Sequence, residues 1–208
     1  MNANPFKEIK ATKRSLNMRK LVFGVGINDA DYHVVTVVNR GKVTCPYYSR
    51  WASMLYRCYS EKCLTKKPSY RGCSVCDEWL TFSNFKSWMS KQDWYKKHLD
   101  KDLLIQGNKI YSEKTCLFVS PEINTLLVSC DSKRGEYPQG VHFNKTAKRH
   151  TSCCMVNGKQ KHIGNYGTPR EASDSYIEFK TNLIKSIAEK QEEPVKSALL
   201  SYNFKEVK

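Results

Sequence analysis

The chain has 208 residues, with 35 lysines and arginines against 20 aspartates and glutamates, and a formal net charge of +15. Hydrophobic residues make up 40% of it, which is enough for a core and excludes wholesale disorder. No apolar run approaches the roughly 20 residues that span a bilayer, so we expect no membrane partner. The basic charge favours a polyanion, because lysine and arginine release counterions from phosphate. On charge alone, a ribosome-type or RNA-binding protein and a lipid-surface protein remain alternatives.

Nine cysteines are an odd number, and the N-terminus lacks the apolar core of a secretory signal. We therefore expect reduced thiols and a cytoplasmic location. The pair Cys73 and Cys76 has the spacing of zinc ligands, and Cys45, Cys58 and Cys63 are the residues that would complete such a site. No second pair with this spacing exists, so the pattern favours structural thiols and zinc is not expected.

In chain order, the first 20 residues predict a basic arm that orders on its partner. Strands are expected over 21–25 and 33–38, with a turn at Gly24 to Asp29. Apolar residues at helical spacing predict helices over 47–58 and 79–88. The second helix carries an aromatic residue at every third position, which favours core packing over base stacking. These residues are Trp79, Phe82, Phe85 and Trp88.

The central segment, 99–119, contains two short apolar stretches on either side of a turn at 106–109. Ser120-Pro121-Glu122 predicts a helix start, with Ser120 as N-cap and the acid in the first turn, and the helix continues to Val128. Residues 131–138 are charged and rich in turn formers, and we interpret them as a linker.

The last third predicts three antiparallel strands and one helix. Strands are expected over 140–144, 151–156 and 159–166, and Asn157-Gly158 indicates a tight hairpin between the last two. Thr168 and Glu171 form a capping-box pattern, with Pro169 at the first helical position, and apolar spacing extends the helix to Ile187. Between Lys133 and Arg170 there are eight basic residues and one acid, so alternation should place basic side chains on the sheet face away from the helix.

This last segment resembles the Apetala-type (ethylene-response-factor-type) DNA-binding domain over about fifty residues. The matching stretches are 140–145, 157–166 and 168–172, while Thr151 to Cys154 departs from the usual aromatic or arginine-bearing strand. The resemblance implies a sheet that docks in the DNA major groove. The expected DNA-binding residues are Lys145, Lys148, Arg149, Lys159, Lys161, His162 and Arg170. His142 and His150 lie among them and are interpreted as phosphate or groove contacts.

Acids beside a histidine, followed by an asparagine on a helix, mark the central segment as the candidate for chemistry. Asp100 and Asp102, beside His98, and Asn124 on the following helix could hold one hard cation, since magnesium takes oxygen ligands and keeps several waters. A bound cation would stabilise the leaving oxygen of a phosphodiester while a nearby base activates water. From the residues alone, a surface salt-bridge cluster is the alternative.

The stretch from Cys45 to Leu127 resembles phage HNH-type homing endonucleases. The matching residues are Leu99-Asp100-Lys101, Gly107-Asn108-Lys109, Tyr111-Ser112 and Cys116-Leu117-Phe118-Val119, with upstream matches between Trp51 and Phe85. The resemblance implies a ββα-metal core in which Asp100 and Asn124 bind one divalent cation. The family's general-base histidine falls on Lys101, and the asparagine that braces its hairpin falls near Thr115. Both are departures, for which Asp102 as a ligand or His98 as the base would compensate.

The chain is therefore expected to be an α+β protein, with an HNH-like core followed by a three-stranded antiparallel sheet and one helix. The expected activity is metal-dependent cleavage of double-stranded DNA, without a small-molecule substrate; the alternative is a catalytically degenerate DNA-binding protein. The expected domains are a basic arm and hairpin over 1–44, the nuclease over 45–130, the DNA-binding module over 138–190 and a tail over 191–208. The expected catalytic residues are His98, Asp100, Lys101, Asp102 and Asn108, and the expected Mg²⁺ or Mn²⁺ ligands are Asp100, Asp102 and Asn124.

Overall fold

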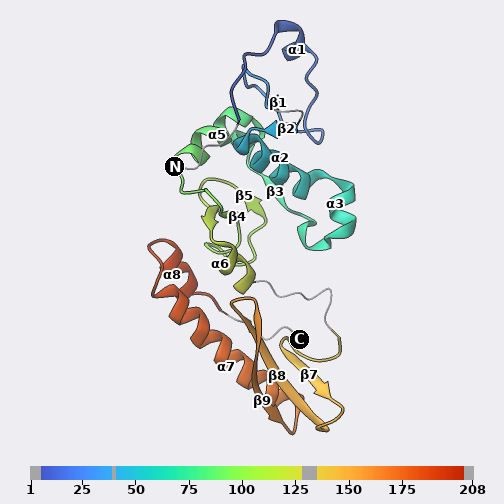
Figure 1. The fold of residues 1–208 in the computed structure, drawn as a ribbon, viewed down its shortest axis with the longest axis vertical. Helices are drawn as coiled ribbons and strands as arrows, with labels where there is room; N and C mark the ends of the chain where they lie inside the picture. Colours follow the sequence, from blue (N-terminus) through green and yellow to red (C-terminus); the bar gives the residue numbers. More distant parts are fainter. Residues whose placement is uncertain (1–5, 39–40, 128–134, 204–208) are drawn as a thin grey trace. The chain divides into compact units, whose positions relative to one another are not determined.

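The computed structural model describes residues 6–38, 41–127 and 135–203. The chain divides into two compact units, Met1–Phe118 and Val119–Lys208. The predicted α+β class is confirmed, with helices between small sheets and one three-stranded antiparallel sheet (Figure 1). None of the described helices is long and apolar enough to cross a membrane.

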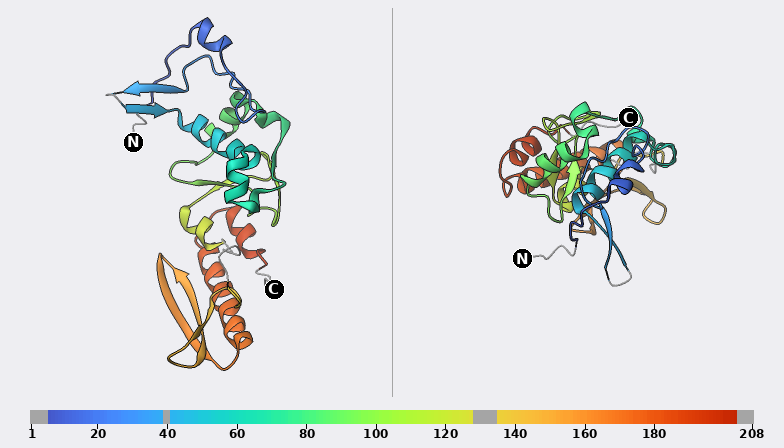
Figure 2. Two further views of the ribbon diagram at one scale, coloured as in Figure 1. Left: turned by 90° about the vertical axis from the view of Figure 1, so that its right-hand side faces the viewer. Right: turned by 90° about the horizontal axis from the view of Figure 1, so that it is seen from above.

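The first unit begins with α1 and the β1–β2 hairpin, which extends away from the helices of this unit (Figure 2). The helices that follow carry most of the core, and three very short strands come last. The elements are α1 (Lys13–Asn17), β1 (Val35–Val38), β2 (Gly41–Thr44), α2 (Pro46–Tyr59), α3 (Glu61–Lys66), the 3-10 helix η1 (Pro68–Tyr70), β3 (Ser74–Val75), α4 (Asp77–Leu80), α5 (Phe82–Ser90), β4 (His98–Asp100), β5 (Ile110–Tyr111) and β6 (Leu117–Val119).

The strand predicted at 21–25 is wrong. Phe23 and Gly24 both have positive φ, and the backbone N–H of Val22 donates to the carbonyl of Gly26 at 2.8 Å, so this segment is a closed turn. A side chain on Gly26 would collide with Trp51 and Leu55, which explains why glycine closes the turn there.

The helix predicted at 79–88 is divided in two at Thr81. Thr81 has an extended backbone because it forms a parallel bridge with Ile27, in which the N–H of Ile27 donates to Leu80 O and the N–H of Phe82 donates to Ile27 O. A distant segment thus overrides helical spacing. The predicted core role of the aromatic stripe is confirmed, since all four of its side chains are buried in one cluster with α2.

The N-terminal segment 6–20 is packed against this unit and does not form a free arm, which corrects that expectation. The Arg19 guanidinium donates to the backbone carbonyls of Asn28, Ala30 and Tyr32, and Glu8 accepts a hydrogen bond from Lys86 at 2.7 Å. The contacts of Arg19 hold the C-terminal end of the segment against the loop before β1, and the contact of Glu8 holds its N-terminal end against α5.

The second unit begins with α6 (Pro121–Leu126), where Ser120 accepts a hydrogen bond from the N–H of Ile123, as the predicted cap requires. Strands β7 (Val141–Asn144), β8 (Arg149–Val156) and β9 (Lys159–Tyr166) pair antiparallel in that order, and α7 (Pro169–Ala188) lies along one face of the sheet (Figures 1 and 2). The predicted three strands, the helix and the Thr168–Glu171 capping box are confirmed. The short helix α8 (Val195–Leu200) was not expected.

Candidate functional site: the Asp100 turn and the outer sheet face

The first candidate site surrounds Asp100, at the end of β4. The pairing of β4 with β6 fixes this strand, and Leu99 is buried, so His98 and Asp100 share its opposite face. The Oδ1 atom of Asp100 accepts hydrogen bonds from the backbone N–H of Asp102 at 2.8 Å and of Leu103 at 2.7 Å. No hydrogen bond among the described residues engages Oδ2. The carboxylate is thus fixed through one oxygen and open through the other.

Burial raises the pKa of Asp100, while the hydrogen bonds from Leu103 and Asp102 act in the opposite direction. Burial disfavours the charged form of the carboxyl, and a divalent cation bound beside it would favour that form. A half-buried carboxylate with one open oxygen is therefore suited to a divalent cation that completes its shell with water. His98 is exposed on the same strand face.

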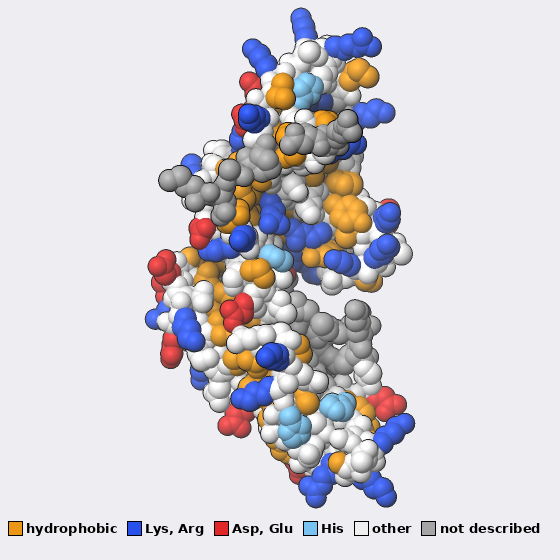
Figure 3. All heavy atoms as spheres, in the orientation of Figure 1, with side chains coloured by type: hydrophobic (Ala, Val, Ile, Leu, Met, Phe, Trp, Pro, Cys, Tyr) orange, Lys and Arg blue, Asp and Glu red, His pale blue; other side chains and the backbone are white. Residues whose placement is uncertain are grey.

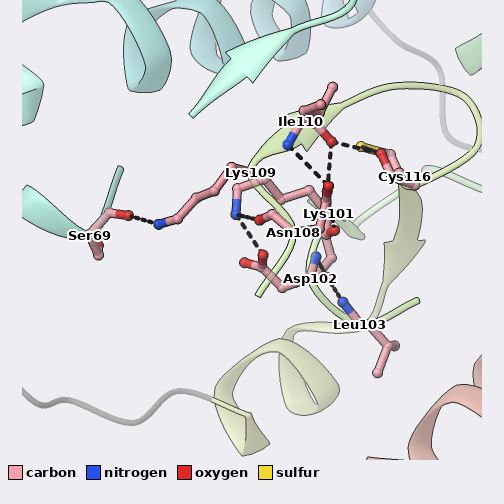
Figure 4. Close-up of polar contacts among 10 residues, drawn as sticks. Ser69, Lys101, Asp102, Leu103, Asn108, Lys109, Ile110 and Cys116 are labelled. Carbon is pink, nitrogen blue, oxygen red and sulfur yellow. Dashed lines mark hydrogen bonds and ion pairs between the residues drawn. The ribbon is translucent and has the colours of Figure 1, made fainter. Parts of the chain in front are cut away.

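Lys101 points away from this face. Its side chain is 7% exposed, and its ammonium donates to Asp102 Oδ1 at 2.6 Å and to the carbonyl of Asn108 at 2.8 Å (Figure 4). The ammonium also lies 5.8 Å from the centroid of the Tyr111 ring. Both partners are hydrogen-bond acceptors, and one is a carboxylate, so this side chain forms a buried ion pair and does not face the Asp100 carboxylate. Asp102, the other predicted ligand, is its partner.

Asn108 braces the turn between β4 and β5. Its Nδ2 donates to the carbonyls of Lys101 at 2.8 Å and Ile110 at 2.7 Å, and its Oδ1 accepts from the N–H of Ile110 at 3.2 Å (Figure 4). The Thr115 hydroxyl adds a hydrogen bond to Ile110 O. Every strong hydrogen-bonding atom of the amide is engaged by the backbone, so its predicted catalytic role gives way to a bracing role. A cavity of about 270 Å³ adjoins the turn, lined by Ser69, Tyr70, Lys101, Asp102, Gly107, Asn108 and Lys109.

Asn124, the remaining predicted metal ligand, is partly buried in α6. This helix belongs to the second unit, and Asp100 belongs to the first. The pairing of Asp100 with Asn124 on one cation, and with it the ββα-metal core, stays a prediction.

The cysteines considered for zinc are free thiols. Burial raises the pKa of Cys58 to about 12 and also raises the pKa of Cys76, which disfavours the thiolate that a metal binds. Within the described ranges, no three His, Cys, Asp or Glu side chains gather as a metal-binding group.

The second candidate site is the face of the β7–β9 sheet that points away from α7, here called the outer face. The register gives its members: Thr151 pairs with His142 and Asn165, Arg149 pairs with Asn144, and Cys153 pairs with His162. Residues on the opposite face contact α7; Tyr166, for example, shares a 2.5 Å hydrogen bond with Ser175. The three strands contain no acidic residue, and lysine, arginine and histidine side chains are visible over this part of the molecule, together with a few acidic ones from other segments (Figure 3).

The seven residues expected to bind DNA fall into three groups. Arg149 and His162 lie on the outer face. Lys145 and Lys148 are exposed in the turn from β7 to β8, next to that face. The other three are on the helix side or beyond the sheet: Lys159 pairs with Val156, the Lys161 ammonium lies 4.8 Å from the centroid of the Phe179 ring of α7, and Arg170 is in the first turn of α7.

His150 lies on the helix side of β8, between the rings of Tyr137 and Phe143 at centroid distances of 5.3 and 5.1 Å. It is an aromatic packing residue here, in place of the expected phosphate contact. Asn165, by contrast, was missed. Its place beside Thr151 depends on the strand register, including an irregularity between Ser152 and Cys153, which the composition of a strand does not reveal.

Comparisons with known proteins add no relative. No family model, no curated protein and no solved structure matches the chain.

Proposed function

We propose that this chain is a metal-dependent DNA endonuclease that holds duplex DNA on the outer face of its three-stranded sheet and cleaves it with one divalent cation at Asp100. The observation that carries the proposal is the outer face itself. It presents Arg149 and His162 beside the basic turn at 145–148, on strands that contain no acidic residue. Basic side chains attract the phosphates of DNA, and these strands have no acidic side chain that would repel them.

The proposal gives the cation a single anchor in the first unit. Asp100 offers Oδ2, and its Oδ1 is already held by two backbone N–H groups. Asp102 is not included, because its carboxylate neutralises Lys101. Magnesium or manganese, when bound, would stabilise the charge that develops on the leaving oxygen. The sequence resemblance adds Asn124 as a second ligand.

His98 is the general base in this proposal. It shares a strand face with Asp100 and is exposed, so water and substrate reach it. The ammonium of Lys101, which stands at the family's base position, is buried against Asp102 and Asn108 and has no lone pair to accept a proton.

A plasmid cleavage assay in Mg²⁺ or Mn²⁺ tests the proposal. The native chain should nick or cut DNA, and Asp100→Ala, Asn124→Ala and His98→Ala should each lower the rate by a hundredfold or more on the usual scale of acid–base and metal catalysis, roughly 10²–10⁴. Glu113→Gln is the matched control, because Glu113 is an exposed acid in the same region with no ion pair among the described contacts. Cleavage by Asp100→Ala at the native rate would remove Asp100 from the mechanism.

The second candidate function is DNA binding without cleavage. The observation that favours it is the buried pairing of Lys101 at the position where the family has its base. The same assay separates the two functions. A native chain that shifts duplex DNA in a gel but never nicks it with any divalent metal is a binding protein that blocks or regulates a site.

A further inference from the structure

One polar network on the outer face joins Thr151, Asn165 and His162. The Thr151 hydroxyl donates to Asn165 Oδ1 at 2.7 Å, and His162 Nε2 lies 3.4 Å from the same oxygen. Thr151 is on the central strand, β8, while Asn165 and His162 are on β9. The three side chains therefore come together only because β8 and β9 pair in this register.

The burial of Thr151 explains why its hydroxyl is held by Asn165. Thr151 is only 4% exposed although it faces away from the helix, because it is on the central strand between His142 and Asn165. A buried hydroxyl needs a partner, and Asn165 Oδ1 is the one it has. That oxygen has two lone-pair directions: Thr151 occupies one, and His162, at 3.4 Å, occupies the other when its Nε2 carries the ring proton.

The other end of the Asn165 amide faces solvent. Asn165 is exposed, and no described residue accepts a hydrogen bond from its Nδ2. The side chain thus presents two N–H donors and no open acceptor. Arg149, two residues before Thr151 on the same strand face, places a cation on this surface as well.

We propose that Asn165 determines base specificity, and that it selects guanine by donating from Nδ2 to the N7 and O6 acceptors in the major groove. The usual asparagine contact is with adenine and needs both amide ends, since Oδ1 must accept from the adenine amino group. Here Thr151 and His162 occupy Oδ1, so adenine loses half of that contact, while guanine needs only donors. This inference rests on the proposed DNA binding and specifies the base that the outer face reads.

The test begins with the native full-length chain and a library of randomised DNA duplexes. At one position, guanine should be preferred over adenine by about tenfold, within the usual range for one specific base contact. Replacing that guanine with 7-deazaguanine, which lacks the N7 acceptor, should remove most of the preference without any change to the protein.

Two variants then change the hydrogen-bonding groups while nearly keeping the shape of the side chains. Asn165→Asp replaces the donor with an acceptor, so the preference should move from guanine to cytosine, whose amino group donates. Thr151→Val removes the hydroxyl that occupies Oδ1, so adenine should bind as well as guanine. Asn144→Asp is the matched control. It adds the same charge to the same face, and its Oδ1 keeps the hydrogen bonds from the N–H groups of Thr146 and Ala147.

The results separate this inference from the function on which it rests. A native chain that selects a sequence, while Asn165→Asp keeps the same base preference, overturns the role of Asn165 and leaves DNA binding intact. A native chain that selects a sequence but tolerates 7-deazaguanine at every guanine overturns it as well, even where a variant fails to fold. A native chain without affinity for duplex DNA overturns the proposed function and this inference together.

Discussion

The Asp100 turn and the outer face of the β7–β9 sheet are both rich in polar side chains, but they use them differently. In the turn, the polar groups satisfy one another: Asn108 engages three backbone groups, and Lys101 pairs with Asp102 and a carbonyl. On the outer face, Asn165 presents its donors to solvent, and Arg149 is exposed. A dense set of polar residues therefore marks a binding surface only where some hydrogen-bonding groups remain open, as Asp100 Oδ2 does in the turn and Asn165 Nδ2 does on the outer face.

The largest expected effect is a loss of stability when the turn around Asn108 loses its hydrogen bonds. Asn108→Ala removes three hydrogen bonds, so that the carbonyl of Lys101 loses its side-chain donor and Ile110 O keeps only the Thr115 hydroxyl, and the free energy of unfolding should fall by about 2–3 kcal/mol. Urea unfolding, followed by tryptophan fluorescence, measures this change in the first unit. Asn84→Ala is the matched control. It removes one exposed hydrogen bond to Glu78 O and should cost less than about 1 kcal/mol. Equal losses for the two variants would contradict the bracing role of Asn108.

A smaller effect is expected on DNA binding by the outer face. Arg149→Gln should weaken binding to duplex DNA about tenfold and reduce the slope of log K against log salt by about 0.9, the value for one phosphate contact. Lys161→Gln should change binding less than threefold on the same scale, because its ammonium lies over the Phe179 ring on the helix side. Fluorescence anisotropy at several salt concentrations measures both.

The control for this pair is Lys185→Gln, which removes the same charge from an exposed position on α7. It corrects for the loss of net charge alone. If Lys161→Gln weakens binding as strongly as Arg149→Gln does, DNA contacts the helix side, and the assignment of the outer face is wrong.

The smallest expected effect concerns the packed side of the same sheet. Lys180 is 5% exposed and lines a cavity of about 420 Å³ that α6, α7 and the β8–β9 hairpin enclose. Burial lowers the pKa of its ammonium. The folded chain therefore holds this proton less tightly than the unfolded chain does. Consequently, the Lys180 contribution to stability rises with pH between the lowered pKa and the ordinary value of 10.5.

Lys180→Met keeps the length of the side chain and removes the buried charge. At neutral pH it should increase the free energy of unfolding by up to about 1 kcal/mol, with a smaller gain at alkaline pH. Thermal unfolding at several pH values measures this, and the exposed Lys185→Met should show neither change. A destabilised Lys180→Met chain would mean that the ammonium has a favourable partner.

Local signals in the sequence predicted the second unit well. Asn157-Gly158, the alternation along 159–166 and the Thr168–Glu171 capping box each act within a few residues, and the structure has the strands and the helix where they predict them. The aromatic stripe at 79–88 predicted burial correctly but not the break at Thr81. That break arises from the bridge to Ile27, more than fifty residues earlier in the chain.

For the candidate site, the sequence by itself determined which residue types are present: the acids and histidine around Asp100, the asparagine on α6 and the basic strands. Only the tertiary structure decided what those side chains do. By residue type alone, Lys101 and Asn108 cannot be distinguished from catalytic groups. The fold pairs Lys101 with Asp102 and Asn108 with the backbone. Lys161 and Asn165 are four residues apart, and the register around the β8–β9 irregularity places the first against α7 and the second beside Thr151 on the outer face. A hydrogen bond depends on which atoms come within about 3 Å, and chain pairing, not local sequence, sets that distance.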